Sequence, residues 1–417
     1  MTTIGLAGAG TIGSGLIRLM NTSPAAGNLR LKRVLVRDSS KAREGVPAGL
    51  LTNSLDDLVG DPEIDVIVEV VGGVAEAFSI VSRALAAGKA VVTANKNLLA
   101  EKGPELFALA ARHKVALGLE ASVCGGIPII RILQEALRAD RVGTVEGIVN
   151  GTTNYLLTRM SDERASYELC LADAQRLGFA EPDPDYDVSG KDAVCKLGIL
   201  ATLAFGGYVD FRTIPTSGIA SLALEDVRQA ETMGYRIKLV ASARRSETGF
   251  EAEVGPVLLP LGHPLASIRM EYNAVLVESE ALVQTLASGK GAGPAPTSVS
   301  LLADLLDIAE GRARVPDAGH PFLGKPLVPG NQGRSRYYLR LSVPDRPGIL
   351  AQVAGLFAQQ SISIASVTQP EIAATQGDLL VPLILTTHAT TRSRLDAVLA
   401  SLDEDWGRSV VLRIQED

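Results

Sequence analysis

The side chains best suited to acid–base chemistry are gathered in residues 181–196, EPDPDYDVSGKDAVCK. Prolines at the start of this stretch exclude a helix there, because proline fixes φ and donates no hydrogen bond. A helical pattern begins near residue 191, so Asp192 and Lys196 share one face of that helix. A solvated acidic loop followed by a surface ion pair would show the same pattern. Alternatively, an ammonium group beside a carboxylate could supply a proton and a positive charge to a reacting oxygen.

A second lysine follows a buried strand. Residues 91–93 read as that strand, and Lys96 comes just after its carboxyl end, the edge where open α/β sheets bind ligands. This lysine could be a solvated loop residue, or it could face a substrate beside a nicotinamide. Two lysines in one site would lower each other's pKa, because a neighbouring like charge disfavours the protonated form. One of them would then be an acid that works near neutral pH.

The N-terminal residues have the pattern of a dinucleotide-binding site. A short apolar strand runs into Gly8-X-Gly10-X-X-Gly13, and a helical pattern and a second strand, residues 31–36, follow. Gly8 permits the turn, Gly10 lets the backbone approach a pyrophosphate, and Gly13 lets the helix and the strand pack closely. The N-terminus of the helix supplies N–H groups and a partial positive charge for the phosphates.

The end of the second strand carries the residues that distinguish NADP from NAD. An acidic residue here binds the ribose 2′-hydroxyl, whereas an arginine accommodates a 2′-phosphate. Arg37 and Lys41 therefore favour NADP, and Asp38 favours NAD. A solvated loop would also account for all three residues. On balance the two cations indicate NADP, with NAD as the alternative.

The segment that closes the first sheet contains two further candidates for chemistry. Glu120 precedes a bend at Gly125, where exposed carbonyl groups and the carboxylate could hold a monovalent cation through oxygen ligands. Cys124 could be the nucleophile of a phosphorylating semialdehyde dehydrogenase, but such a nucleophile needs a base to form the thiolate. The four histidines of the chain lie in unrelated contexts. We therefore expect a mainly structural role for Cys124.

The middle of the chain reads as a second domain of α+β type. Residues 145–155 indicate a strand that opens into a polar loop, where Gly151 and Thr152 offer groups to a polar substrate or cap the following helix. Strand-like runs without intervening helices then predict a mixed sheet, at residues 235–243, 250–259, 272–278 and 281–286. A glycine-rich turn before a helix at residues 299–310 suggests that the chain returns to the nucleotide-binding domain.

The last part of the chain reads as βαββαβ, a ferredoxin-like module. A stretch rich in Pro and Gly, without periodicity, precedes it and reads as a linker. A regulatory or dimerisation role suits a module without a cluster of chemical residues. The predicted organisation is a nucleotide-binding domain (1–128), a substrate-binding and dimerisation domain (129–312, of which 299–312 return to the first domain), a linker (313–336) and the C-terminal module (337–417).

Composition narrows the class of protein. A chain of 417 residues is too long for one typical core, so two or three domains are expected. The net charge of −7 makes nucleic acid an unsuitable partner, and no apolar run approaches the length of a membrane span. The three cysteines lack metal-site spacing, and the first strand begins without a charged leader. A reduced, cytoplasmic enzyme fits these features.

With these segments assembled, the chain resembles the homoserine dehydrogenases over nearly its whole length. The motifs that match in the family's order are Gly8-Ala-Gly-Thr-Ile-Gly13, Thr93-Ala-Asn-Lys96, Glu120-Ala-Ser-Val-Cys-Gly-Gly-Ile-Pro128, Asn150-Gly-Thr-Thr-Asn-Tyr155, Glu181-Pro-Asp-Pro184, Asp187-Val-Ser-Gly-Lys-Asp-Ala-Val-Cys-Lys196 and Gly291-Ala-Gly293. The C-terminal module, with Asp345-Arg-Pro-Gly348, looks like an ACT domain.

The resemblance implies NAD(P)-dependent interconversion of L-homoserine and L-aspartate 4-semialdehyde, on the route to threonine and methionine. It implies a homodimer or homotetramer built through the middle domain, and an amino-acid effector such as threonine at the ACT domain. By the same resemblance, Lys96 and Lys196 are the catalytic lysines, with Asp192 beside them. The substrate site would comprise Glu181, Asp187, Gly151, Thr152 and Lys96. Glu120 and the backbone of Val123, Gly125 and Ile127 would match the family's sodium site. The cofactor site would comprise Gly8, Gly10, Thr11, Ile12, Gly13, Arg37, Lys41, Gly72, Thr93, Lys96 and Gly293.

Two other functions remain open at this point. One is a phosphorylating semialdehyde dehydrogenase that uses Cys124. The other is an amino-acid sensor that has kept a nucleotide-binding domain and lost catalysis. The presence of Lys96, Asp192 and Lys196 counts against the sensor.

Overall fold

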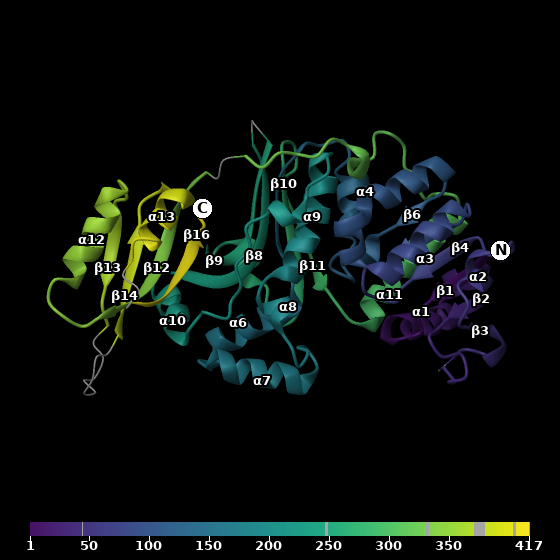
Figure 1. Ribbon diagram of the computed structural model, residues 1–417, viewed down its shortest axis with the longest axis horizontal. Helices are drawn as coiled ribbons and strands as arrows, with labels where there is room; N and C mark the ends of the chain where they lie inside the picture. The colour runs from purple at the N-terminus through teal and green to yellow at the C-terminus, as the bar shows by residue number, and fades with distance from the viewer. Residues whose placement is uncertain (44, 247–248, 331–332, 371–379, 403–405, 417) are drawn as a thin grey trace.

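Two β-sheets organise the chain, one parallel and one mixed (Figure 1). The computed structural model describes residues 1–43, 45–246, 249–330, 333–370, 380–402 and 406–416. The N-terminal domain lies at one end of an elongated molecule, the C-terminal domain lies at the other, and the substrate domain lies between them (Figure 1). The fold class predicted from the sequence is confirmed.

The first sheet has the strand order β3-β2-β1-β4-β5-β6, and each of its pairs is parallel. This is the order of a dinucleotide-binding Rossmann sheet. Its strands are mostly apolar because helices cover both faces. The elements are β1 (Thr2–Ala7), α1 (Thr11–Thr22), β2 (Leu29–Leu35), β3 (Leu51–Thr52), α2 (Asp56–Val59), β4 (Val66–Glu69), α3 (Ala75–Ala86), β5 (Ala90–Thr93), α4 (Lys96–His113) and β6 (Leu117–Gly118).

Helix α11 (Pro294–Ala309) comes late in the chain but packs on this first domain. Its buried Leu301 and Leu305 belong to the same apolar cluster as Leu6 and Leu16. The close approach of α1 and α11 depends on Gly15, where a Cβ would lie 2.8 Å from the Ser298 hydroxyl. The boundaries that we assigned to the domains stay a prediction.

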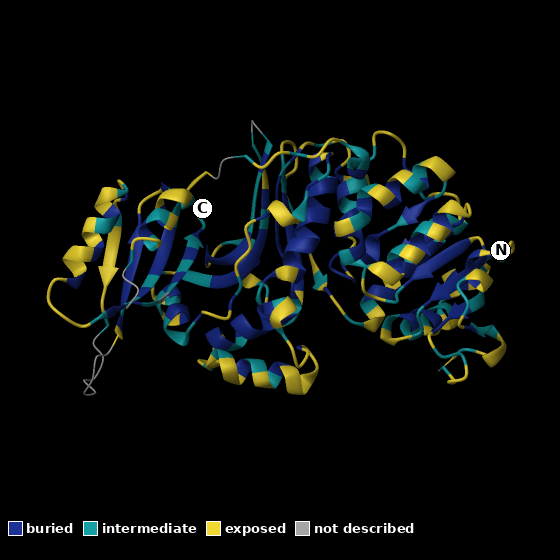
Figure 2. Ribbon diagram, in the orientation of Figure 1, coloured by how far each residue is buried: buried dark blue, intermediate teal, exposed yellow. Residues whose placement is uncertain are grey.

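The substrate domain is built on the mixed sheet and on helices that pack against it. Its elements are α5 (Ile129–Arg131), a π-helical turn (Ile132–Ala136), β7 (Val142–Ile148), α6 (Gly151–Glu163), α7 (Tyr167–Leu177), α8 (Asp185–Val188), α9 (Lys191–Phe205), α10 (Leu224–Thr232), β8 (Tyr235–Ser246), β9 (Gly249–Pro260), β10 (Tyr272–Ser279) and β11 (Val283–Lys290). Helix α9 is buried along most of its length, including its charged residues Asp192 and Lys196 (Figure 2). A helix that is buried on nearly all sides can hold charges only where they are paired.

The C-terminal domain does not form a separate sheet. Its β16 (Gly407–Ile414) pairs in parallel with β9. One ten-stranded sheet therefore runs in the order β11-β10-β7-β8-β9-β16-β12-β14-β13, and its tenth strand, β15, pairs with β12 beside this path. The other elements of the domain are β12 (Arg334–Pro344), α12 (Ile349–Gln359), β13 (Ile364–Thr368), β14 (Leu380–Thr387), β15 (Thr390–Thr391) and α13 (Arg392–Leu399). The substrate domain and the C-terminal domain therefore share one hydrogen-bonded sheet.

Part of the stretch that the sequence indicates as a linker is docked on the first domain. Phe322 is buried, and its ring stacks on Phe107 of α4 with a centroid distance of 4.7 Å. His320 stacks on the same ring at 4.1 Å. Strand β12 already begins at Arg334, within the expected linker. Burial of aromatic rings explains why a segment without periodicity can still be ordered.

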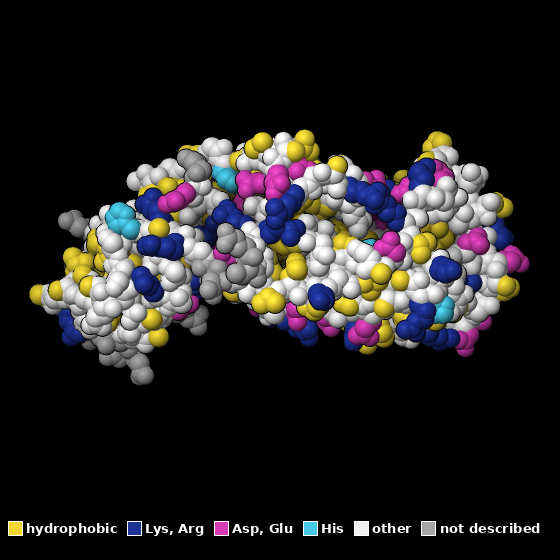
Figure 3. Space-filling view, turned by 90° about the horizontal axis from the view of Figure 1, so that it is seen from above, with side chains coloured by type: hydrophobic (Ala, Val, Ile, Leu, Met, Phe, Trp, Pro, Cys, Tyr) yellow, Lys and Arg dark blue, Asp and Glu magenta, His cyan; other side chains and the backbone are white. Residues whose placement is uncertain are grey.

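Side chains of both charge signs lie on the face of the molecule that Figure 3 shows. In the view of Figure 3, side chains of Lys and Arg are interspersed with those of Asp and Glu. Within the residues that the structure describes, none of the helices has the length and apolar character needed to cross a bilayer.

Candidate active site

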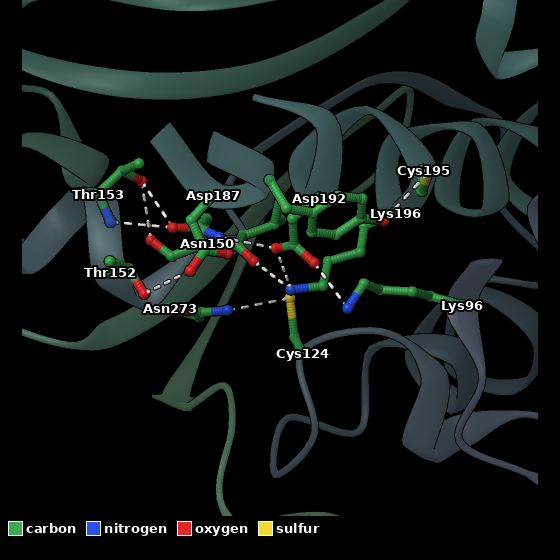
Figure 4. A network of polar contacts seen from close by, with 12 residues as sticks. Lys96, Cys124, Asn150, Thr152, Thr153, Asp187, Asp192, Cys195, Lys196 and Asn273 are labelled. Atoms are coloured by element: carbon green, nitrogen blue, oxygen red, sulfur yellow. Dashed lines mark hydrogen bonds and ion pairs between the residues drawn. The ribbon is translucent and has the colours of Figure 1, made fainter. Parts of the chain in front are cut away.

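Asp192 joins a lysine from each of two domains (Figure 4). Its Oδ2 accepts a hydrogen bond from Lys196 Nζ at 2.7 Å, and its Oδ1 lies 2.9 Å from Lys96 Nζ. Lys196 also donates to the carbonyl of Val149 at 2.7 Å. Asp192 and Lys196 are buried, whereas 29% of the Lys96 side chain is exposed. Helix spacing predicted the Asp192–Lys196 pair, and the family resemblance assigned Lys96 to the same site. The structure brings Lys96 there from the first turn of α4.

The charges of this cluster set its protonation. Burial by itself lowers the pKa of Lys196, but the adjacent Asp192 carboxylate outweighs it, and the pKa lies above its usual value. Burial acts against the ionised form of Asp192, yet Lys196 and Lys96 hold its pKa far below the usual range. The expectation that the two lysines lower each other's pKa is therefore wrong for Lys196. The physical reason is that a carboxylate stands between the two ammonium groups.

Asn150 connects this cluster to the neighbouring helix. As the residue before α6, it accepts a hydrogen bond from the Thr153 amide through Oδ1 at 2.9 Å. Its Nδ2 donates to Asp192 and to Asp187, each at 2.8 Å. The side-chain amide has one acceptor and two donor hydrogens, so all of its hydrogen-bonding groups are used. The helix cap thus fixes the two carboxylates relative to each other.

Gly151 and Thr152 lie at the start of α6, not in a loop. The loop expected there is replaced by a helix because Asn150 caps it. The Thr152 hydroxyl lies 2.7 Å from the Phe179 carbonyl and 3.0 Å from Asp187 Oδ2, so it orients Asp187. Glu181 is exposed, and its carbonyl accepts a hydrogen bond from Gln175. Asp187 thus belongs to the cluster, while Glu181 lies outside its hydrogen bonds.

Cys124 borders the same cluster but is not activated. It is buried, and Asn273 Nδ2 lies 3.7 Å from its sulfur. Burial raises the pKa of the Cys124 thiol. A thiol that is buried and protonated is not a nucleophile. This environment gives the phosphorylating mechanism no support.

The glycine turn after β1 has the shape that a pyrophosphate needs. Gly8 has φ +103°, and a Cβ there would lie 2.7 Å from the Val70 carbonyl. A Cβ at Gly13 would lie 2.1 Å from the Gly8 carbonyl. A Cβ at Gly10 would meet no described atom within 4 Å, so the backbone there is open to a ligand at the N-terminus of α1. These three positions fit a nicotinamide dinucleotide, with Thr11 and Ile12 forming the first turn of the helix.

A cleft of about 720 Å³ extends from this turn along the end of β2. Gly8, Gly10 and Arg37 line it, together with Arg43 and Asn53, which sequence reasoning did not single out. The exposed Arg37 guanidinium lies 3.5 Å from Glu76, another lining residue.

Other residues assigned to the cofactor lie at different places around this edge of the sheet. Lys41 is exposed and pairs with Asp38 at 3.5 Å. Thr93 is buried, and its hydroxyl donates to Glu69 at 2.6 Å, so its side chain holds the sheet together. Gly72 and Gly293 have φ values of +77° and +113°, and they precede α3 and α11 respectively.

Three of the four residues assigned to a sodium ion use their oxygens in hydrogen bonds within the protein. Both Glu120 oxygens accept backbone hydrogen bonds, from Ile130 at 3.0 Å and from Arg131 at 2.9 Å. The Arg131 guanidinium lies 3.5 Å from the same carboxylate and already supplies a positive charge. The Gly125 carbonyl accepts the Ser300 hydroxyl, and the Ile127 carbonyl accepts the Ile129 amide. The sodium site with Val123 stays a prediction without support from these contacts.

Sequence reasoning assigned no role to Asn150, Asn273 or Tyr186. Tyr186 lies beside the cluster, with Lys96 Nζ 5.5 Å from its ring centroid. The signal for Asn150 was its place directly before a helix, because asparagine is a favoured N-cap residue. The hydrogen bonds of Asn150 and Asn273 to distant residues could be found only in the fold.

Comparison with known proteins agrees with this geometry. The family model for the homoserine dehydrogenase NAD-binding domain matches residues 8–120, that for homoserine dehydrogenase matches 128–306, and that for the ACT domain matches 337–406. A homoserine dehydrogenase of Pseudomonas aeruginosa is 40% identical over 99% of this chain and 98% of its own length, and one of Bacillus subtilis is 38% identical over 96% and 94%.

A crystal structure of a homoserine dehydrogenase from Thiobacillus denitrificans is similar to this chain, with a TM-score of 0.89 and 40% sequence identity. The match covers 100% of this chain and 98% of the chain in that structure. The matches therefore extend over all three parts of the chain, including the sheet shared by the last two. The chain belongs to the homoserine dehydrogenase family, NAD(P)-dependent oxidoreductases that act on a CH–OH group.

Proposed function

We propose that Lys196 transfers the proton at the reacting oxygen, and that Lys96 supplies the second positive charge there. The observation that carries this proposal is the Asp192 carboxylate between the two ammonium groups. When bound, the nicotinamide would supply or accept the hydride. As hydride reaches the aldehyde carbon, the oxygen gains negative charge, and an ammonium group both stabilises that charge and protonates it.

The raised pKa of Lys196 gives the reaction a direction-dependent response to pH. Reduction of the semialdehyde uses the ammonium form, which persists well above neutral pH because Asp192 stabilises it. Oxidation of homoserine needs the neutral amine as a base. Oxidation should therefore speed up as the pH rises above neutral, while reduction should slow down only at high pH.

We propose that Asp187 and Glu181 bind the α-ammonium group of the substrate. Asp187 is positioned by Asn150 and Thr152, and Glu181 is exposed nearby in the sequence. The α-carboxylate then lies toward the amides of Gly151 and Thr152, because the N-terminus of a helix favours an anion. These assignments place both charged groups of homoserine beside the lysine cluster.

A spectrophotometric assay of homoserine oxidation with NAD and with NADP tests the activity and the cofactor together. We expect oxidation with both and a lower KM for NADP, because Arg37 lines the cleft at the end of β2. Arg37→Ala should raise the KM for NADP much more than that for NAD. Lys102→Ala is the matched control, since that partly exposed ammonium pairs with Glu105 and does not line the cleft. Equal effects of Arg37→Ala on the two cofactors would remove Arg37 from the 2′-phosphate site.

We further propose a homodimer formed through the substrate domain. Strand β11 is an edge of the mixed sheet, and it exposes Val283 and Leu286, with Leu282 just before it. Apolar side chains along a free strand edge are suited to association. Light scattering should give twice the mass of the chain, and Leu286→Lys should shift it toward the monomer. A monomeric wild type would contradict the proposal, and a tetramer would require a second interface.

Threonine is proposed as an effector of the C-terminal domain, and the cytoplasm as the location. The ACT match supports an amino-acid effector, and the three free cysteines suit a reducing compartment. Adding threonine to the oxidation assay should lower the rate of the full chain. An unchanged rate would remove threonine as an effector.

A further inference from the structure

We propose that Arg340, in the C-terminal domain, is a positioning residue for the active site of the substrate domain. It would act through residues 214–223, called here the support segment, which connect α9 and α10 through a loop. The proposal rests on the roles assigned above to Asp187 and Asp192. It concerns an arginine that contacts neither the reacting atoms nor the cleft.

The C-terminal domain holds the support segment through a buried carboxylate. Asp226, in the first turn of α10, is fully buried and accepts hydrogen bonds from Arg340 Nε at 2.7 Å and Nη2 at 2.9 Å. The Tyr338 hydroxyl also donates to Asp226, at 2.9 Å. Arg340 Nη2 additionally donates to the Ser221 carbonyl at 3.2 Å. One guanidinium from β12 thus binds both α10 and the support segment.

The other side of the support segment contacts the active site directly. The Leu222 amide donates to the Ile219 carbonyl, and the Ile219 amide donates to the Val188 carbonyl at 2.9 Å. Val188 follows Asp187 in α8. A Cβ at Gly218 would lie 2.2 Å from the Val188 carbonyl, so the two backbones are as close as they can be. A displacement of Ser221 would therefore be passed to α8 over a short path.

The same segment also borders the start of α9. Gly190, the residue before α9, has φ +87°, and a Cβ there would lie 2.9 Å from Thr216 Cγ2. The Gly190 amide donates to the Asp187 carbonyl at 3.1 Å. Asp192 is in the first turn of the helix that begins here. The support segment therefore packs against the turn between the two carboxylates that the mechanism uses.

A second attachment limits what a change at Arg340 can do. The Ser217 amide donates to the Val254 carbonyl, and the Val254 amide donates to the Pro215 carbonyl, so strand β9 holds the N-terminal half of the segment. Loss of Arg340 would release only the half that contains Ile219 and Ser221. Figure 1 shows α10 between the C-terminal domain and α6, in agreement with this arrangement. We therefore expect displacement of α8 with β9 still holding the segment.

The test uses the full-length enzyme with Arg340→Lys and Arg340→Met. Lysine keeps the positive charge beside Asp226 but cannot bind Asp226 and Ser221 together as the planar guanidinium does. Arg392→Met is the matched control, because it breaks an exposed ion pair, to Asp396, in the same domain. For each variant, kcat, the KM for homoserine, the KM for the cofactor and the thermal midpoint of unfolding are measured.

We expect Arg340→Lys to unfold near the wild-type temperature and to raise the KM for homoserine by about tenfold, because small displacements of positioning groups have effects of up to roughly 10²-fold. The KM for the cofactor should stay within about twofold, since the glycine turn and its cleft are in another domain. Arg392→Met should change neither KM.

Two results would overturn the proposal. One is a folded Arg340→Lys enzyme with an unchanged KM for homoserine, which would leave Arg340 as a stabilising residue only. The other is an equal rise of both KM values. If Arg340→Met does not fold, the two KM values of Arg340→Lys alone decide whether the proposal holds. Failure of the substrate-binding role proposed for Asp187 would appear separately, as an unchanged KM for homoserine in Asp187→Asn.

Discussion

Two lysines of the substrate domain, Lys196 and Lys238, are both buried, yet their pKa values move in opposite directions. Lys196 donates to Asp192, and its pKa is raised although burial opposes its charge. Lys238, on β8, donates to the Asn154 side-chain oxygen at 2.7 Å and to the Ile268 carbonyl. Burial lowers the pKa of Lys238 to about 7, and Arg236 adds to the effect.

The difference shows that burial does not by itself determine the charge of a lysine. Neutral oxygens such as those around Lys238 satisfy hydrogen bonds but offset little of the lost solvation. A carboxylate such as Asp192 stabilises the ammonium form directly. The active site thus keeps a charged lysine in a buried place, whereas the contacts of Lys238 link β8 to α6 without a countercharge.

The largest effect is expected for Lys196→Met. The variant loses a proton donor and a positive charge at the reacting oxygen, and kcat should fall by about 10²–10⁴-fold. Lys196→Arg should rescue little, because a guanidinium does not give up its proton near neutral pH. The KM for the cofactor should stay near that of the wild type.

Lys191→Met is the control, because Lys191 is on the same helix but exposed and paired with Asp185. Its kcat should match the wild type. A near-normal kcat for folded Lys196→Met would mean that Lys196 is only part of a structural ion pair.

A smaller effect is expected for Asp192→Asn. This variant removes the carboxylate that raises the pKa of Lys196, a countercharge that Lys238 lacks among its contacts. Without the carboxylate, burial would lower the pKa of Lys196. The rise of homoserine oxidation with pH should therefore move to lower pH, and kcat should fall by roughly tenfold or more as Lys196 loses its orientation.

The pH profile of kcat measures this shift, with Asp185→Asn as the control on an exposed carboxylate. An unshifted profile would show that Asp192 does not control the protonation of Lys196.

The smallest effect on catalysis and a clear effect on stability are expected for Lys238→Met. The folded pKa of Lys238 is about 7, below the value of about 10.4 in an unfolded chain, so the unfolded state binds more protons between these pH values. The free energy of unfolding of the wild type should therefore rise with pH across this window. Relative to Lys238→Met, the gain should be of the order of 2–4 kcal/mol.

Urea unfolding at pH 7 and at pH 9.5 checks the sign, with Lys191→Met as the control for an exposed lysine. If the two proteins respond to pH in parallel, Lys238 is charged throughout and has a countercharge that its contacts do not reveal.

Local sequence predicts some features of this protein because their causes are local. The positions of Gly8, Gly10 and Gly13 follow from the steric needs of one turn. In the structure a Cβ at Gly8 or Gly13 would collide with the backbone, whereas the backbone at Gly10 is open to a ligand. The pairing of Asp192 with Lys196 follows from their spacing on a helix. The sequence left Thr152 open between a loop and the start of a helix, because both begin with the same residue types, and the structure places it in the first turn of α6.

Other features depend on contacts between distant segments. Spacing along the chain could not show that Lys96 pairs with Asp192, since the two residues come from different domains, and only the family resemblance assigned both to one site. It could not show that Lys238 is buried away from carboxylates, because an alternating strand pattern only assigns it to a face. The pairing of β16 with β9, which joins the C-terminal domain to the substrate sheet, likewise has no local signal.

The sequence by itself determined the order of the elements, the nucleotide-binding turn and the residue types of the lysine–aspartate cluster, because chain sterics and helix spacing act over a few residues. The tertiary structure decided which charges are neighbours. It therefore decided that the pKa of Lys196 is raised, that the pKa of Lys238 is lowered and that Arg340 contacts the support segment. The physical reason is that solvation and Coulomb energies depend on distances through space, which only the folded chain fixes.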